Sequence, residues 1–258
     1  MTRTLAPALA LLLALTACGA DDGDGAAAPA ASSDPAATAL TVFAAASLTE
    51  SFTELGEAYE AAHPGADVTF SFAGSQALVA QVQQGAPADV LATADQRSVE
   101  AVAGELAGSP QVFAKNQLAI VTEPGNPLGL TGLADLAVAD VKVVLADDSV
   151  PVGRASAAAL EAAGVVVRPV SEEQDVKAVL QKVRLGEADA GIVYVTDVRS
   201  AGDDVAGVQL PGVTNAYPLA ALADAPHRAA ADAFVAFVLS AQGQAVLASY
   251  GFLPPSAT

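Results

Sequence analysis

Five positions in the sequence offer uncharged hydrogen-bond donors where an apolar strand ends or a helix is expected to begin. They are Ser47, Ser75, Val152, Val176 and Tyr194. The serines and the tyrosine bring hydroxyl groups, and the two valines bring backbone N–H groups near predicted helix starts. Unpaired N–H groups and the helix dipole make a helix N-terminus attractive to anions. The set therefore indicates a site for a small anion that is built from dipoles.

The absence of a carboxylate from this set narrows the kind of anion that it could bind. A tetrahedral dianion without a proton of its own needs only donors, and sulfate, molybdate and tungstate meet that description at neutral pH. Phosphate often keeps a proton and gains from a carboxylate acceptor. Each charge-assisted hydrogen bond contributes about 1.5–3 kcal/mol. The residue types thus favour a fully deprotonated oxyanion, without choosing among the three.

Each hydroxyl also has a purely structural interpretation. Ser47 and Glu50 form a Ser-x-x-Glu capping box, in which Ser47 would only cap its helix. Ser75 alone would be a turn residue, and Tyr194 a core aromatic with a solvated hydroxyl. Because a hydroxyl can accept and donate at once, Ser47 can both cap its helix and bind a ligand. We interpret Arg154 as part of a solvated helix face and not as a charge partner of the ligand.

A serine hydrolase is the competing class of protein, because serines at strand-to-helix turns resemble nucleophile elbows. The stretch 72–77 does not match Gly-x-Ser-x-Gly, and only His63 and His227 could act as general bases. Each histidine adjoins a proline at a predicted helix boundary, which favours a surface or capping role. Two isolated histidines and one cysteine do not indicate a zinc site, and no nucleotide-binding motif is present. We predict a protein that is not an enzyme and has no cofactor.

The chain has 258 residues, enough for two modest domains, and 53% of them are hydrophobic. A formal net charge of −18 argues against nucleic acid as a partner, because no basic patch is available to neutralise phosphates. Exposed charges are screened beyond roughly 8 Å at physiological salt. An acidic surface is therefore compatible with an anion that is held by dipoles at contact distance.

Strands alternate with helices through most of the chain, which indicates an α/β fold with largely parallel sheets and ligand sites at the carboxyl ends of strands. Strands are expected at residues 40–44, 68–72, 89–93, 117–122, 141–146, 165–170, 190–195, 208–210 and 218–222. Helices are expected at residues 48–62, after Ser75, and at 96–103, 154–163, 171–185, 228–239 and 244–250.

The N-terminus has the features of a lipoprotein signal peptide at residues 1–17. Arg3 supplies a positive charge, residues 5–15 form an apolar run too short to span a bilayer, and the stretch 15–18 resembles a bacterial lipobox. Cys18 would then carry lipid and anchor the protein to the outer face of the cell membrane. The alternative is an ordinary secretory signal with an unused Cys18. Residues 18–38 have the composition of a flexible linker.

Several short motifs occur in a characteristic order along the chain. They are residues 41–49, Gly85-Ala86-Pro87-Ala88-Asp89-Val90, Ala94-Asp95-Gln96, Gly191-Ile192-Val193-Tyr194 and Tyr250-Gly251-Phe252. Together they resemble the periplasmic molybdate-binding proteins of ABC importers over about residues 39–253. The resemblance implies a two-lobed type II periplasmic binding protein fold, with a mixed, mainly parallel sheet in each lobe and a ligand cleft between the lobes. Lobe I would comprise residues 39–117 and 217–258, and lobe II residues 118–216.

The resemblance also implies a role for each candidate residue. In that family two serine hydroxyls, backbone N–H groups and a tyrosine hydroxyl hold the oxyanion. By motif match these groups fall on Ser47, Ser75, Val152, Val176 and Tyr194. Val152 stands where the family commonly has alanine, which leaves the backbone N–H in place. Gly74 stands where the family often has serine, and we expect no change of ligand class from it.

The resemblance implies capture of molybdate, and of tungstate, by a monomer that delivers the oxyanion to a membrane permease and its ATPase. The metal would be bound only as the oxyanion, through the five residues above. A carrier of sulfate or phosphate on the same fold is the alternative within this class.

Overall fold

The computed structural model describes residues 38–256, which belong to one compact unit. The signal peptide expected at residues 1–17 and the lipidation of Cys18 fall outside the described residues. The linker expected at residues 18–38 does so as well, except that Thr38 begins the first strand.

The described residues contain eight strands. Their bounds are β1 Thr38–Ala45, β2 Ala66–Ala73, β3 Val90–Ala92, β4 Gln111–Thr122, β5 Val143–Ala146, β6 Ser171–Glu173, β7 Ala190–Tyr194 and β8 Ala206–Ala221. They form one continuous sheet in the order β2-β1-β3-β8-β4-β7-β5-β6. Neighbouring strands are parallel at both ends of the sheet, and every pair that includes β4 or β8 is antiparallel.

Helices cover the faces of this sheet. Their bounds are α1 Thr49–Ala62, α2 Ser75–Gln83, α3 Gln96–Glu100, α4 Pro151–Ala162, α5 Val176–Arg184, α6 Val195–Ala201, α7 Arg228–Leu239 and α8 Ala241–Ser249, with short 3₁₀ segments at Ala46–Leu48, Ala103–Glu105, Leu133–Ala137 and Gly202–Asp204. Within residues 38–256 no single helix is long and apolar enough to cross a membrane, and α7 with α8 passes that test only as a pair bent by 61°.

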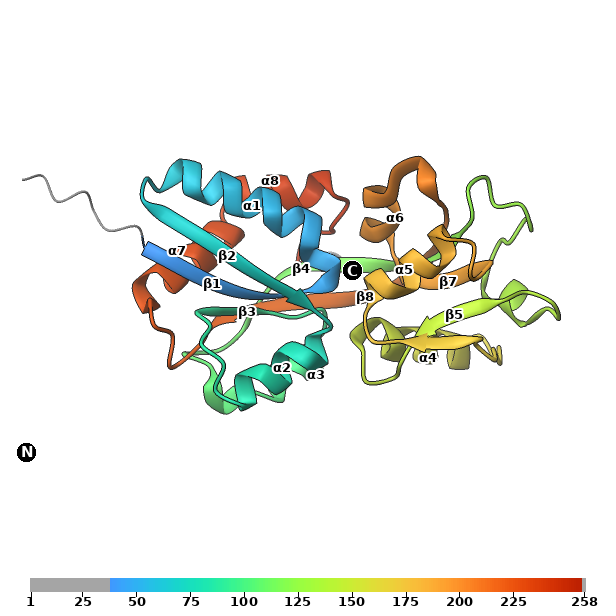
Figure 1. Cartoon of the computed structure of the whole chain (residues 1–258), viewed down its shortest axis with the longest axis horizontal. Helices are drawn as coiled ribbons and strands as arrows, with labels where there is room; N and C mark the ends of the chain where they lie inside the picture. Colours follow the sequence, from blue (N-terminus) through green and yellow to red (C-terminus); the bar gives the residue numbers. More distant parts are fainter. Residues whose placement is uncertain (1–37, 257–258) are drawn as a thin grey trace, which may run out of the picture. The chain divides into compact units, whose positions relative to one another are not determined.

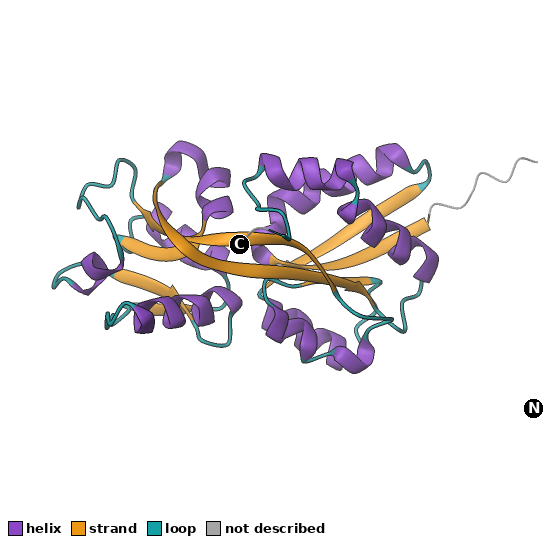
Figure 2. Cartoon of the chain, turned by 180° about the vertical axis from the view of Figure 1, so that it is seen from behind, coloured by secondary structure: helices purple, strands orange, loops and turns teal. Residues whose placement is uncertain are grey.

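The elements gather into two groups at the two ends of the long β4–β8 pair (Figures 1 and 2). We call β1, β2 and β3 with α1, α2, α3, α7 and α8 lobe I, and β5, β6 and β7 with α4, α5 and α6 lobe II. The strands β4 and β8, 12 and 16 residues long, run through both groups. The boundaries between the two expected lobes, at 117/118 and 216/217, fall within these two strands. The division of the chain at those residues stays a prediction.

The strand β8 differs from the sequence expectation of two short strands separated by residues 215–217. Those residues remain paired with β4, with Asn215 opposite Asn116 and Tyr217 opposite Ala114. An irregularity in register between Gln117 and Ala119 falls where the apolar pattern of β8 is interrupted. One long strand therefore brings two polar side chains, which the sequence placed in a loop, into the middle of the sheet.

Other helices and strands near the site begin at residues that differ from the sequence prediction. The strand expected at residues 165–170 is wrong, because the edge strand is β6, which the sequence assigned to the start of a helix. The helix α5 begins later, at Val176, where the Asp175 carboxylate accepts from the Ala178 N–H at 2.9 Å as an N-cap. The helix α4 begins three residues earlier than expected, with Pro151 at its first position. Both backbone-donor positions thus lie in a first helical turn.

Candidate functional site

A small pocket lies between the two lobes, at the ends of β1, β2 and β7. Its wall contains the five residues expected from the sequence, Ser47, Ser75, Val152, Val176 and Tyr194. The wall also includes Ala45, Ala46, Gly74, Ala94, Pro151 and Asp175. Only about 10 Å³ is open to the centre of a water-sized sphere, which is about the room that one water molecule needs.

Four helix starts line this pocket. They are the 3₁₀ segment that leads into α1 and the first turns of α2, α4 and α5. The first N–H groups of a helix have no partner within the helix, and the N-terminal end of its dipole is positive. The convergence of several such ends makes the pocket attractive to an anion without any cationic side chain in its wall.

Ser47 is buried, and its Oγ lies 2.8 Å from the hydroxyl oxygen of Tyr217. The capping-box interpretation is wrong, because the N-cap of α1 is Leu48 and no side chain caps that helix. The Glu50 carboxylate instead binds the Lys177 ammonium group at 2.7 Å. The hydroxyl of Ser47 is therefore not needed by its own helix.

Ser75 and Tyr194 are both 1% exposed, and each hydroxyl oxygen already accepts a hydrogen bond from the protein. The Ala94 N–H donates to Ser75 Oγ at 3.0 Å, and Asn215 Nδ2 donates to the Tyr194 hydroxyl at 2.8 Å. Burial raises the pKa of Tyr194 well above its usual value, so that this hydroxyl keeps its proton. Both groups are left with a hydrogen to donate.

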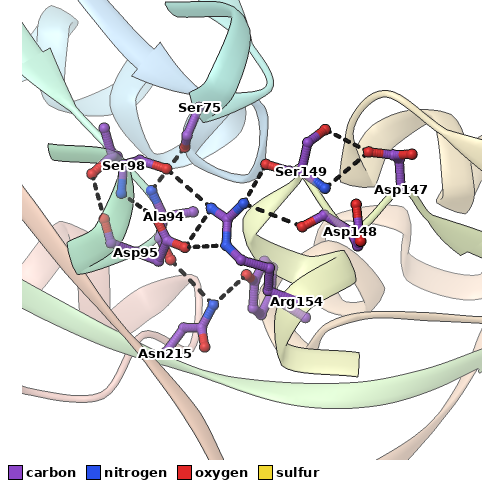
Figure 3. Close-up of polar contacts among 11 residues, drawn as sticks. Ser75, Ala94, Asp95, Ser98, Asp147, Asp148, Ser149, Arg154 and Asn215 are labelled. Atoms are coloured by element: carbon purple, nitrogen blue, oxygen red, sulfur yellow. Dashed lines mark hydrogen bonds and ion pairs between the residues drawn. The ribbon is translucent and has the colours of Figure 1, made fainter. Parts of the chain in front are cut away.

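Arg154 lies close to the pocket, but its charge is used elsewhere. Its Nη2 is 2.6 Å from Asp95 Oδ2, and its Nη1 donates to the carbonyl oxygens of Asp148 and Ser149 (Figure 3). The side chain is 21% exposed, so the expected solvated helix face is wrong. The Arg154–Asp95 pair instead joins α4 of lobe II to the start of α3 in lobe I.

Lys177 is the second cation beside the pocket. Its Nζ lies 2.7 Å from Glu50 Oε2 in α1 and 3.0 Å from Asp197 Oδ1 in α6. Burial alone would lower the pKa of Lys177, but the carboxylates of Asp197 and Glu50 outweigh burial and raise it. Both cations next to the pocket are therefore paired with carboxylates, and the wall itself contains no cationic side chain.

Gly74 permits the close approach of the two lobes at the edge of the pocket. A Cβ atom built on Gly74 would lie 2.5 Å from the carbonyl oxygen of Gln174 in lobe II. That carbonyl oxygen accepts a hydrogen bond from Gln76 Nε2 at 2.7 Å. A serine here, which is common in the family that the sequence resembles, would require the lobes to sit further apart.

The sequence missed three residues behind the pocket wall: Asn116, Asn215 and Tyr217. Their signal was a polar side chain within or beside an apolar strand, and Asn116 and Tyr217 are both 0% exposed. A buried amide is kept only where hydrogen bonds satisfy it. The partners of these residues lie in distant parts of the chain, so their roles could not be assigned from sequence.

The two histidines do not contact the pocket serines. His63 stacks on Tyr59 with ring centroids 4.1 Å apart, and His227 Nδ1 lies 3.4 Å from Asp89 Oδ2. Within residues 38–256 no group of three or more His, Cys, Asp or Glu side chains could hold a metal ion. Neither histidine is therefore placed to act as a general base for Ser47 or Ser75.

Comparison with known proteins gives matches over almost the whole described chain. Residues 40–253 match the family described as bacterial extracellular solute-binding protein. The molybdate-binding protein ModA of Mycobacterium tuberculosis H37Rv is 43% identical over 250 residues, which is 95% of each chain.

Two solved structures share the fold at 21% identity. The periplasmic molybdate-binding protein of Azotobacter vinelandii aligns with a TM-score of 0.72. The alignment covers 84% of this chain and 100% of the Azotobacter chain. The sulfate-binding protein SubI of Mycobacterium tuberculosis H37Rv has a TM-score of 0.73 and covers 85% and 88%. The two-lobed periplasmic binding protein fold expected from the sequence is confirmed.

Proposed function

Because this chain belongs to the family of bacterial extracellular solute-binding proteins, we propose that it captures molybdate outside the cytoplasm and delivers it to an ABC importer. The observation that supports this most is the pocket, whose wall unites two serine hydroxyls, a tyrosine hydroxyl and the starts of several helices. A wall of uncharged donors without a cationic side chain suits a dianion that has no proton to donate. The molybdate-binding protein that is 43% identical supports the same ligand.

In this proposal the oxyanion accepts hydrogen bonds from the hydroxyls of Ser47, Ser75 and Tyr194 and from the N–H groups of Val152 and Val176. Tungstate, which has the same charge and shape as molybdate, binds in the same way. The metal enters only as part of the oxyanion, no covalent step follows, and the protein is not an enzyme. Closure of lobe I (residues 39–117 and 217–258) on lobe II (residues 118–216) surrounds the ligand.

Residues 1–17 serve as a lipoprotein signal peptide, and lipidated Cys18 holds the protein at the outer face of the membrane through the linker that follows. From there a monomer presents its ligand to the permease, and the cytoplasmic ATPase drives transport. Labelling with a radioactive fatty acid that is lost in Cys18→Ser tests the anchor.

Sulfate is the second candidate ligand, because it too is a tetrahedral dianion that requires only donors. The fold that this chain shares with a sulfate-binding protein supports sulfate as a candidate ligand. Phosphate fits less well, because its proton would find no carboxylate acceptor in the pocket wall other than Asp175, which already caps α5.

Molybdate and tungstate should raise the melting temperature of the protein, and sulfate and phosphate at the same concentration should raise it much less. A ligand at about 100 times its Kd adds about 2.7 kcal/mol, which corresponds to roughly 5–11 °C for a chain of this size. Differential scanning calorimetry with the four anions as their sodium salts measures the shift. A larger shift with sulfate or phosphate than with molybdate would contradict the ligand assignment.

Ser75→Ala and Tyr194→Phe should each weaken molybdate binding by about 10- to 100-fold while the protein still folds. Each change removes one charge-assisted hydrogen bond of about 1.5–3 kcal/mol. Isothermal titration calorimetry gives the affinities, and circular dichroism reports folding. The matched controls are Ser249→Ala and Tyr250→Phe, whose hydroxyls bond to Val246 and Glu54 away from the pocket. Unchanged affinity in both pocket variants would show that the ligand binds elsewhere.

A further inference from the structure

A chain of hydrogen bonds behind the pocket begins at Asn116, in the middle of β4. The Asn116 Oδ1 accepts from the Gln117 N–H at 3.0 Å, which fixes which end of the amide is the oxygen. The Nδ2 group therefore points the other way, toward Thr196 Oγ1 at 2.8 Å and the Tyr217 hydroxyl oxygen at 3.3 Å. Asn116 thus donates a hydrogen bond to Tyr217.

The hydroxyl of Tyr217 is in turn placed to donate a hydrogen bond to Ser47. Its ring is held edge-on against Phe113 and Phe252, with centroids 6.2 and 5.5 Å away. Burial raises its pKa, so the hydroxyl stays protonated at neutral pH. Since Asn116 donates to the hydroxyl oxygen, the proton of Tyr217 is available for Ser47 Oγ at 2.8 Å.

The hydroxyl of Tyr194 also interacts with that of Tyr217. Tyr194 already accepts from Asn215 Nδ2, whose orientation is fixed because this nitrogen also faces the Ala94 carbonyl oxygen at 3.2 Å. Tyr194 therefore has its own proton free for a ligand, and its oxygen already accepts from Asn215. We take Ser47 Oγ, 2.8 Å away, as the acceptor of the Tyr217 proton.

We propose that Tyr217, oriented by Asn116, is a positioning residue. It donates a hydrogen bond to Ser47 Oγ and thereby directs the hydroxyl hydrogen of Ser47 into the pocket. The inference rests on the proposed function, because it assigns Ser47 as a donor to the bound oxyanion. It adds a source of selectivity: an oxyanion that carries a proton needs an acceptor, and Tyr217 takes up one of the two lone pairs of Ser47 Oγ. Tyr217 and Asn116 thereby favour fully deprotonated oxyanions such as molybdate over hydrogen phosphate.

A double-mutant cycle on Ser47→Ala and Tyr217→Phe tests this inference, with molybdate affinity measured by isothermal titration calorimetry. Tyr217→Phe should weaken molybdate binding by about threefold, since the serine hydroxyl can then occupy three staggered rotamers in place of one. In the Ser47→Ala background the same change should have almost no further effect, because Tyr217 acts through Ser47. Equal losses in the two backgrounds would overturn the inference, since a purely structural role of Tyr217 gives additive effects.

The ratio of molybdate to hydrogen phosphate affinity is the second readout, obtained for phosphate by competition. Tyr217→Phe should lower this ratio by about three- to tenfold, because the freed Ser47 oxygen can accept the phosphate proton. An unchanged ratio would overturn the selectivity role. Tyr250→Phe removes a tyrosine hydroxyl outside the pocket and should change neither quantity.

A replacement variant and the binding behaviour of the wild type distinguish failure of this inference from failure of the proposed function. If Tyr217→Phe does not fold, Asn116→Ala replaces it, and its loss of affinity should likewise vanish in the Ser47→Ala background. If the wild-type protein binds none of molybdate, tungstate, sulfate and phosphate, the proposed function fails together with this inference. Binding by the wild type with additive losses in the variants overturns only the inference.

Discussion

Lys177→Met should destabilise the protein by about 3–5 kcal/mol at pH 7, because it leaves a buried carboxylate without its counter-charge. The Asp197 side chain is 0% exposed, and its Oδ1 lies 3.0 Å from Lys177 Nζ. Apart from this ion pair, the oxygen has no hydrogen-bond partner among the described residues. The other oxygen accepts from the Tyr194 N–H at 3.1 Å, so the carboxylate cannot turn away without releasing a residue of the pocket wall.

The loss should depend on pH, with a sign set by the pKa of Asp197. Burial raises this pKa above its value in the unfolded chain, and the charge of Lys177 opposes the rise. Removing Lys177 raises the pKa further. A carboxyl group with a raised pKa in the folded state stabilises the protein at low pH, and that stability is lost as pH rises through the folded-state pKa. The penalty should therefore be largest at neutral pH and should shrink as pH falls toward about 4, the pKa of an unfolded aspartate.

Urea unfolding of wild type and variant between pH 4.5 and 8 measures this difference. The double variant Lys177→Met/Asp197→Asn should recover most of the stability, because no buried charge remains. Lys182→Met is the matched control, since Lys182 pairs with Glu173 and Glu187 at 3.4 and 3.6 Å near the surface, where a pair contributes about 0–1 kcal/mol. A loss that is the same at every pH, or one that the double variant fails to relieve, would exclude a role for the buried charge.

The position of Lys177 explains why a residue that does not line the pocket matters for it. The lysine follows Val176 in α5, and its two carboxylate partners lie in α1 and α6. These helices begin just after Ser47 and Tyr194, so one ammonium group ties together three walls of the pocket. Arg154 and Asp95 form a similar tie near Ser75 and Val152. Paired charges hold the wall in place, while the wall itself contains no cationic side chain.

The sequence could indicate the pocket residues because each carries a local signal. Ser47 and Ser75 follow apolar strands at the start of helices, and Pro151 is pre-organised for the first position of a helix. Such signals depend on a few neighbouring residues, and parallel strands bring their carboxyl ends to the same edge of a sheet. The resemblance to a known family then connected positions that local patterns could only suggest one by one.

The partners of these residues could not be predicted in the same way. The Ser-x-x-Glu pattern suggested a cap, but Glu50 binds Lys177, 127 residues away, and Ser47 meets Tyr217 across 170 residues. Long-range pairs decide which of two locally sensible roles a side chain takes. The sequence predicts two short strands in place of β8 for the same reason. The apolar pattern of β8 is interrupted, but its long-range pairing with β4 keeps it one strand.

Gly153→Ala should destabilise the protein by about 3 kcal/mol or more and weaken oxyanion binding by at least about tenfold. Gly153 lies in the first turn of α4, next to Val152. A Cβ atom at this position would lie 2.0 Å from the carbonyl oxygen of Asp147 and 2.6 Å from that of Ala146. Both contacts are with backbone, so no side chain can move aside to relieve them.

The first turn of α4 would therefore have to shift away from the end of β5, and the N–H of Val152 would shift with it. Urea unfolding and titration with molybdate measure the two effects on the same variant. Gly104→Ala is the matched control, because a Cβ atom there meets nothing within 4 Å. A similar small loss in both variants would show that α4 tolerates displacement and that the pocket does not depend on its close approach to β5. A loss of stability in Gly153→Ala with affinity unchanged would instead separate the packing of α4 from ligand binding and remove Val152 from the proposed site.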